Sequence, residues 1–205
     1  MNIFVTGGTG FVGTYLCKDL LHRGHRVTAV GTRPIHGRIS HEHFRYLSAD
    51  TTEPGQWQEA LADIDAAVNL AGKNIFSRWT DRYKQELYDS RILTTRSLVD
   101  VLPADRPVTL VSASAVGYYG SRGDEILTED SEPGNDFLAR LGRDWEAEAL
   151  RAAEKQIRVV TARFGIVLGG EGGALGQMLP FFRKGLGGPL GSGKQWVSWV
   201  HRSDL

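Results

Sequence analysis

Hydroxyl-bearing side chains gather where an apolar run ends. The run VTLV is followed by SASAVGYYG (112–120), which carries Ser112, Ser114, Tyr118 and Tyr119. A serine hydroxyl can hold a reacting oxygen, and a tyrosine phenol can exchange a proton with it. We therefore predict Ser114, Tyr118 and Tyr119 as catalytic candidates and Ser112 as a residue that lines a cofactor crevice. Two other interpretations remain open: strand-end turn serines, and one tyrosine that only packs in the core.

A glycine-rich loop precedes the first helix-like segment. The sequence GGTGFVG (7–13) follows the apolar run NIFVT directly and opens an amphipathic stretch. Glycines in this strand–turn–helix context allow close approach of the backbone to a pyrophosphate, which the helix N-terminus attracts. The spacing G-x-x-G-x-x-G differs from the G-x-G-x-x-G of standard dinucleotide dehydrogenases. The predicted contacts with the nucleotide are Gly7, Thr9, Gly10, Phe11, Val12 and Gly13.

The end of the second predicted strand indicates which nucleotide is bound. RVTAVG (26–31) continues into Thr32 and Arg33 without a carboxylate. An acidic residue there would bind the ribose 2′-hydroxyl of NAD, whereas an arginine suits the 2′-phosphate of NADP. We therefore predict NADP(H) in preference to NAD(H), and the absence of that carboxylate also argues against a methyltransferase that binds S-adenosylmethionine. An exposed arginine at a strand end is the alternative role for Arg33.

Two further strand ends supply candidate nucleotide contacts. Asp50, after the third strand, could accept the adenine amino group or could simply cap a turn. In NLAG (69–72) the small residues would let the chain pass close to a ribose, so Leu70, Ala71 and Gly72 are predicted contacts. Asn69 is expected inside the sheet.

These candidates require a parallel sheet to position them. Strand-like runs at 2–6, 26–31, 44–49, 66–72, 108–114 and 158–164 alternate with helical segments that end near Arg23 or cover 55–64, 80–102 and 138–155. This alternation predicts an α/β fold with a doubly wound parallel sheet of strand order 3-2-1-4-5-6 and helices on both faces. We assign residues 1–165 to an NADP-binding Rossmann domain. The glycine-rich residues 166–205 are predicted to begin a substrate-binding or lid region that is incomplete.

Composition narrows the class of protein. The 205 residues hold 24 basic and 24 acidic side chains, a balance that argues against nucleic acid or an anionic membrane as partner. The single Cys17 favours a reducing compartment, and we find no apolar run long enough to span a bilayer. We expect a cytoplasmic protein with a small-molecule substrate and no metal site. The long helices at 80–102 and 138–155 could pair across a homodimer.

Five motifs together resemble one superfamily. TGGTGFVG, NLAG, SASAVGYYG, RFGIVLG and WVHRSDL are similar to the extended and atypical short-chain dehydrogenase/reductase superfamily, in its epimerase-like branch. The resemblance covers nearly the whole chain. It implies a Rossmann domain with an NADP-type nucleotide, followed by a C-terminal substrate region that is only partly present. We include Arg163, from the RFGIVLG motif, among the cofactor-binding candidates.

The chain departs from the superfamily at its usual proton donor. Active extended members are expected to carry Tyr-x-x-x-Lys on the helix that follows the catalytic serine. Those positions fall here on Leu138 and Gly142, or on Phe137 and Leu141. Either Tyr118 or Tyr119 replaces the acid, with a cation such as Lys73, Arg140 or Arg143 beside it, or the protein is a nucleotide-binding sensor without chemistry. Because the hydroxyls of the fifth strand are present, we favour an oxidoreductase or epimerase acting on a small carbonyl or sugar-like substrate, in which Glu129 could bind substrate hydroxyls.

Overall fold

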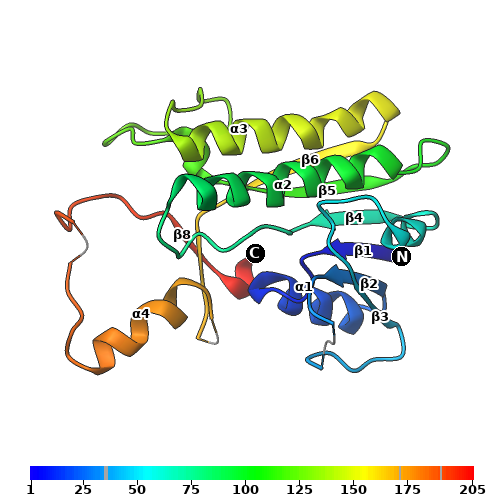
Figure 1. The fold of residues 1–205 in the computed structure, drawn as a ribbon, viewed down its shortest axis with the longest axis horizontal. Coiled ribbons are helices and arrows are strands. Elements are labelled where there is room, and N and C mark those ends of the chain that lie inside the picture. The colour runs from blue at the N-terminus through cyan, green and yellow to red at the C-terminus, as the bar shows by residue number, and fades with distance from the viewer. Residues whose placement is uncertain (35–36, 171, 190) are drawn as a thin grey trace. The chain divides into compact units, whose positions relative to one another are not determined.

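The computed structural model describes residues 1–34, 37–170, 172–189 and 191–205. Its main feature is a six-stranded sheet in the order β3-β2-β1-β4-β5-β6 (Figure 1), with parallel registers from β3 through β5. The predicted doubly wound fold is confirmed. The strands are β1 (Asn2–Thr6), β2 (Arg26–Gly31), β3 (Phe44–Ser48), β4 (Ala66–Asn69), β5 (Thr109–Ala115) and β6 (Arg158–Phe164).

Helices cover both faces of the sheet because its central strands are apolar on both sides. In β1, Phe4 points into one hydrophobic cluster while Ile3 and Val5 point into the other. The Phe4 cluster is closed by the short helix η1 (Gln56–Leu61), α2 (Asp81–Val101) and α3 (Phe137–Leu150), and the other by α1 (Phe11–His22).

Helix ends follow local signals in the sequence. Gly24 adopts φ +81°, and its N–H bonds to the carbonyl of Leu21, so α1 ends near Arg23 as predicted. The Thr80 hydroxyl caps α2 by accepting the N–H of Tyr83 at 3.2 Å. Asp136 accepts the N–H of Ala139 at 2.9 Å at the start of α3. The Rossmann helices are therefore largely specified by nearby residues.

Three features differ from the sequence-based expectation. β4 ends at Asn69 rather than at Gly72. The N–H of Leu70 lies 3.2 Å from both the carbonyl and the hydroxyl of Thr6, and the N–H of Ala71 donates to that hydroxyl at 3.2 Å. A short helix, η2 (Val116–Tyr119), follows β5 directly. A second sheet pairs β7 (Ile166–Leu168) with β8 (Trp199–His201) in parallel. Partners so far apart in the chain leave no local pattern that would reveal them.

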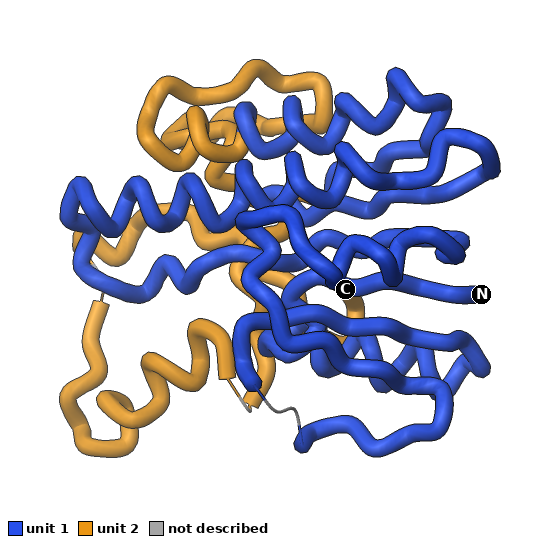
Figure 2. The backbone as a smooth tube through the Cα atoms, turned by 45° about the vertical axis from the view of Figure 1, so that its right-hand side comes forward, with its two compact units in different colours: residues 1–114, 143–162 blue, residues 115–142, 163–205 orange. Residues whose placement is uncertain are grey.

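The chain divides into two compact units (Figure 2). The first comprises residues 1–114 and 143–162, and the second comprises residues 115–142 and 163–205. The first unit holds most of the six-stranded sheet. The second holds η2, the small sheet and α4 (Gly173–Arg183). The division of nucleotide and substrate regions near residue 165 stays a prediction.

A buried polar cluster lies at the carboxyl ends of the central strands. Asn69 is 0% exposed, as expected for a residue inside the sheet. It accepts the Thr6 hydroxyl at 2.6 Å and donates to Thr95 at 2.8 Å and to Ser112 at 3.2 Å. Because buried polar groups without partners are costly, this side chain stabilises three strand and helix positions together.

We predict that Asn69→Ala lowers the free energy of unfolding by roughly 2–4 kcal/mol, because it leaves three buried polar groups short of a partner. Urea denaturation followed by circular dichroism measures this loss. Asn135→Ala, at an exposed position, is the control and should change stability by less than about 0.5 kcal/mol. Equal stability of the two variants would contradict the role of the cluster.

Candidate nucleotide-binding and catalytic site

Close contacts of its backbone set the shape of the glycine loop. Gly7 adopts φ +66°, donates its N–H to Val30 at 3.0 Å and accepts the N–H of Gly10 at 2.9 Å. A Cβ atom at Gly13 would lie 2.3 Å from the Gly7 carbonyl oxygen, and one at Gly8 would lie 2.6 Å from the Cβ of Ala29. The turn therefore has no space for side chains at these positions.

The glycine loop leads directly into the N-terminus of α1, which has no side-chain cap. Gly10 is the N-cap of α1 and has no side chain to cap the helix, and the first turn holds no acidic residue. The positive end of the helix dipole therefore has no acidic side chain in the first turn beside it and can attract an external anion. Together with the close backbone packing, this arrangement fits the pyrophosphate of a dinucleotide.

Cys17 packs against the glycine loop. Its thiol is fully buried and lies 3.9 Å from the carbonyl oxygen of Gly8. Burial raises the pKa of Cys17 to about 12, so the thiol stays protonated and unreactive. Its role here is packing beneath the loop.

We predict that Gly13→Ala weakens NADPH binding at least about tenfold, because overpacking against a backbone oxygen typically costs about 1–3 kcal/mol. Fluorescence titration with NADPH measures the dissociation constant. Gly176→Ala inside α4 is the matched control, since a Cβ there meets no atom within 4 Å. Wild-type affinity in Gly13→Ala would contradict this geometry of the loop.

Arg33 lies just beyond β2, where the 2′-phosphate was predicted. Its side chain is exposed, and its backbone carbonyl accepts the hydroxyl of Tyr46 at 2.6 Å. The same hydroxyl lies 3.0 Å from the carbonyl of Gly31. Desolvation raises the pKa of Tyr46, which keeps the phenol protonated as a donor. Tyr46 thus fixes the backbone that carries Arg33.

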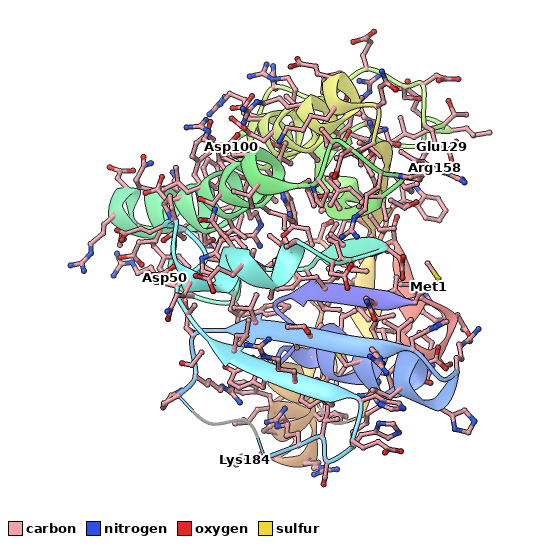
Figure 3. All side chains as sticks on the ribbon, turned by 90° about the vertical axis from the view of Figure 1, so that its right-hand side faces the viewer. Met1, Asp50, Asp100, Glu129, Arg158 and Lys184 are labelled. Carbon is pink, nitrogen blue, oxygen red and sulfur yellow. The ribbon has the colours of Figure 1, made fainter. Side chains whose placement is uncertain are left out.

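Asp50 has an immediate local role. The residue follows β3 (Figure 3), and its carboxylate accepts the N–H of Thr52 at 3.0 Å and the Thr52 hydroxyl at 2.7 Å. This is the turn-capping arrangement that the sequence left open. Asp50 is exposed, so a contact with the adenine stays a prediction.

The segment after β4 lies against the glycine loop. A Cβ atom at Gly7 would come within 2.8 Å of the Leu70 backbone and 2.9 Å of the Ala71 nitrogen. On the other side, the guanidinium of Arg91 covers Gly72, where a Cβ would lie 3.0 Å from Cζ. The predicted contacts at 70–72 therefore run directly beside the phosphate loop.

The two serines of β5 have separate partners. Ser112, paired with Asn69 in register, belongs to the buried cluster described above. Ser114 is 3% exposed and donates its hydroxyl to Glu146 of α3 at 2.5 Å. Glu146 is itself 6% exposed. The contact joins residues 32 positions apart, and no local pattern in the sequence predicts it.

The two tyrosines, in the second unit, share one arginine. Their rings meet edge to face at 5.3 Å, and Tyr119 is buried whereas Tyr118 is half-buried. The Arg163 guanidinium lies 3.7 Å from the Tyr118 ring centroid and donates to the Tyr119 hydroxyl at 2.8 Å. Arg163 also donates to the backbone carbonyl of Glu129 at 2.8 Å. The assignment of Arg163 to the cofactor thus stays a prediction, whereas its contact with both tyrosines is part of the structure.

The other predicted cations have different partners. Lys73 pairs with Glu86, and this pairing lowers the pKa of the Glu86 carboxyl. Arg140 donates to the Asn135 carbonyl at 2.6 Å, and Arg143 pairs with its neighbour Asp144 at 3.0 Å. The sequence offered no means of choosing Arg163, because it follows the tyrosines by more than forty residues.

The helix positions that lack the Tyr-x-x-x-Lys pair pack against the tyrosine segment. A Cβ at Gly142 would lie 3.3 Å from the Tyr118 Cα, and one at Gly117 would lie 3.3 Å from the Leu138 side chain. Both contacts lie within the second unit. The η2 segment therefore fits against a helix face whose side chains are small or apolar at those positions.

A cavity of about 450 Å³ opens at the opposite edge of the sheet. It lies at the amino ends of β1, β2 and β3, where Asn2, Arg26 and His43 contribute to its lining. The glycine loop and the start of α1 lie at the carboxyl ends. Since parallel sheets bind nucleotides at their carboxyl ends, this cavity is not the nucleotide site.

Comparison with known proteins identifies the family. The family model for the NAD-dependent epimerase/dehydratase family matches residues 3–205. The chain belongs to this family. Among the described residues, no helix is both long and apolar enough to cross a membrane.

Individual relatives match the whole chain but extend further. The chloroplastic SDR39U1 homolog of Arabidopsis thaliana, an epimerase family protein, is 41% identical, and the chain spans 60% of its length. The crystal structure of the human epimerase family protein SDR39U1 with NADPH matches all of this chain and 67% of its own, with a TM-score of 0.80 and 38% identity. A nucleoside-diphosphate sugar epimerase from Corynebacterium glutamicum matches with a TM-score of 0.80 and 35% identity over 41% of that chain.

Proposed function

We propose that this protein is an NADP(H)-dependent oxidoreductase or epimerase acting on a small carbonyl or sugar-like substrate. The observation that carries the proposal is the glycine-lined, uncapped N-terminus of α1, which no acidic side chain occupies. Such a terminus binds a pyrophosphate through backbone N–H groups and the helix dipole. The human relative with NADPH supports a dinucleotide in the same fold.

The preference for NADP(H) rests on Arg33. β2 ends without a carboxylate, and the exposed Arg33 follows it on a backbone fixed by Tyr46. A guanidinium offers a planar, permanently charged fork for a 2′-phosphate. NADH lacks that phosphate and would bind more weakly.

The chemistry proposed for the substrate uses Ser114. When bound, NADP(H) supplies or accepts the hydride. The Ser114 hydroxyl donates to Glu146, so the lone pairs of its oxygen remain to accept the O–H of a substrate alcohol. Glu146 fixes the orientation of that hydroxyl, as a positioning residue acting through Ser114.

In the reverse direction, reduction of a substrate carbonyl, Tyr119 is the proposed donor of the proton to the substrate oxygen. Tyr118 is the alternative. The Tyr119 oxygen accepts from Arg163, which leaves its own proton to be donated elsewhere. A cation beside a phenol favours transfer of that proton. Arg163 would thereby take the part that lysine plays in the usual pair.

A second candidate is a nucleotide-binding sensor that performs no chemistry. Leu138 and Gly142, at the usual Tyr and Lys positions, are used for packing against Gly117 and Tyr118. Tight NADPH binding without hydride transfer to any of a broad panel of carbonyl compounds would favour the sensor. Turnover that Tyr119→Phe abolishes would favour the enzyme.

We predict that Arg33→Ala weakens NADPH binding about 10- to 100-fold and leaves NADH binding unchanged, because a hydrogen-bonded charge pair contributes about 1.5–3 kcal/mol. Parallel titrations with the two nucleotides measure the ratio of dissociation constants. Arg45→Ala, at an exposed position within β3, is the control. An unchanged ratio in Arg33→Ala would refute selection of the 2′-phosphate by this residue.

A further inference from the structure

Arg91 is a half-buried cation on α2. Its guanidinium donates to the carbonyls of Leu87 at 3.0 Å and Lys73 at 3.1 Å. The charged carbon also lies 5.3 Å from the ring centroid of Trp145. These contacts fix the position of the charge.

Within the described parts of the chain, Arg91 forms no ion pair with a carboxylate. By contrast Arg96, one and a half turns further along the same helix, pairs with Glu148. Burial lowers the pKa of Arg91 to about 10, which still leaves the guanidinium positive at neutral pH. A buried charge without a counter-charge is costly, and such groups concentrate at binding sites.

The position of Arg91 connects it to the nucleotide crevice. Its guanidinium covers Gly72, where a Cβ would lie 3.0 Å from Cζ. The adjoining backbone of Leu70 and Ala71 lies against Gly7 of the phosphate loop. The segment 70–72 therefore contacts the loop through Leu70 and Ala71 and the guanidinium through Gly72, at the carboxyl ends of neighbouring strands.

We propose that Arg91 is a cofactor-binding residue whose fixed positive charge attracts the pyrophosphate of the dinucleotide. The inference rests on the proposed function, since it requires a dinucleotide in the crevice. It differs from the role of Arg33, which addresses the 2′-phosphate at the adenosine end. Arg91 therefore serves NADPH and NADH alike.

The test compares Arg91→Met and Arg91→Lys with Arg96→Met, a matched control on the same helix. The dissociation constants of NADPH, NADH and adenosine 2′,5′-bisphosphate are measured at several salt concentrations. Arg91→Met should weaken both dinucleotides by the same factor, roughly tenfold, as expected for one charge in a partly buried site. Binding of the bisphosphate, which carries a single phosphate in place of the pyrophosphate and no nicotinamide, should weaken less.

Two further measurements distinguish an effect of the Arg91 charge from an effect of its packing. Arg91→Met should reduce the salt dependence of NADPH binding, because one fewer cation meets the ligand, and Arg91→Lys should retain most of the affinity. If Arg91→Met does not fold, Arg91→Gln replaces it in the comparison with Arg91→Lys.

Three outcomes would overturn the inference. If Arg91→Met binds both dinucleotides with wild-type affinity, the charge of Arg91 does not contribute to binding. Equal weakening of all three ligands, with lower thermal stability and unchanged salt dependence, assigns Arg91 a structural role only. Failure of the wild-type protein to bind NADPH or NADH refutes the proposed function itself, and this inference falls with it.

Discussion

The site depends on the absence of side-chain atoms in the glycine loop. Gly7, Gly8 and Gly13 each lie where a Cβ would overlap neighbouring atoms, and the backbone therefore approaches β2, β4 and the start of α1 directly. Because the contacts of Gly7 and Gly13 join backbone to backbone, they bring the end of β1, the segment 70–72 and the helix N-terminus into a fixed relation. The anion site of α1 is a consequence of that packing.

A buried polar layer maintains the same edge of the sheet. Asn69 links Thr6, Thr95 and Ser112, and the indole N–H of Trp145 donates to Thr95 at 2.9 Å. Such networks specify a single arrangement, because any shift in register would leave buried groups unpaired. Ser114 and Glu146 continue this layer between β5 and α3. The strand ends that would face the substrate therefore carry hydroxyl groups whose positions are fixed by buried hydrogen bonds.

Much of the fold could be predicted from the sequence. The alternation of apolar strands and amphipathic helices predicted the order of the six strands, and Gly24 marked the end of the first helix by local chemistry. The glycine loop was recognisable because its function depends on consecutive residues. The contacts of Ser114 with Glu146, of Tyr119 with Arg163 and of Arg91 with Gly72 could not be predicted. Each joins residues distant in the chain, and in each case the partner is a residue type that is common on ordinary protein surfaces.

The central claim is that NADP(H) lies along the carboxyl edge of the sheet with its reactive carbon near Ser114. A crystal structure of the protein with NADP⁺ bound would test it most directly. We expect the pyrophosphate on the N–H groups of residues 10–13, the 2′-phosphate on Arg33, and nicotinamide C4 close enough to Ser114 for a substrate oxygen to lie about 3 Å from the serine hydroxyl. A nucleotide bound elsewhere, or a nicotinamide turned away from Ser114 toward apolar side chains only, would contradict the account.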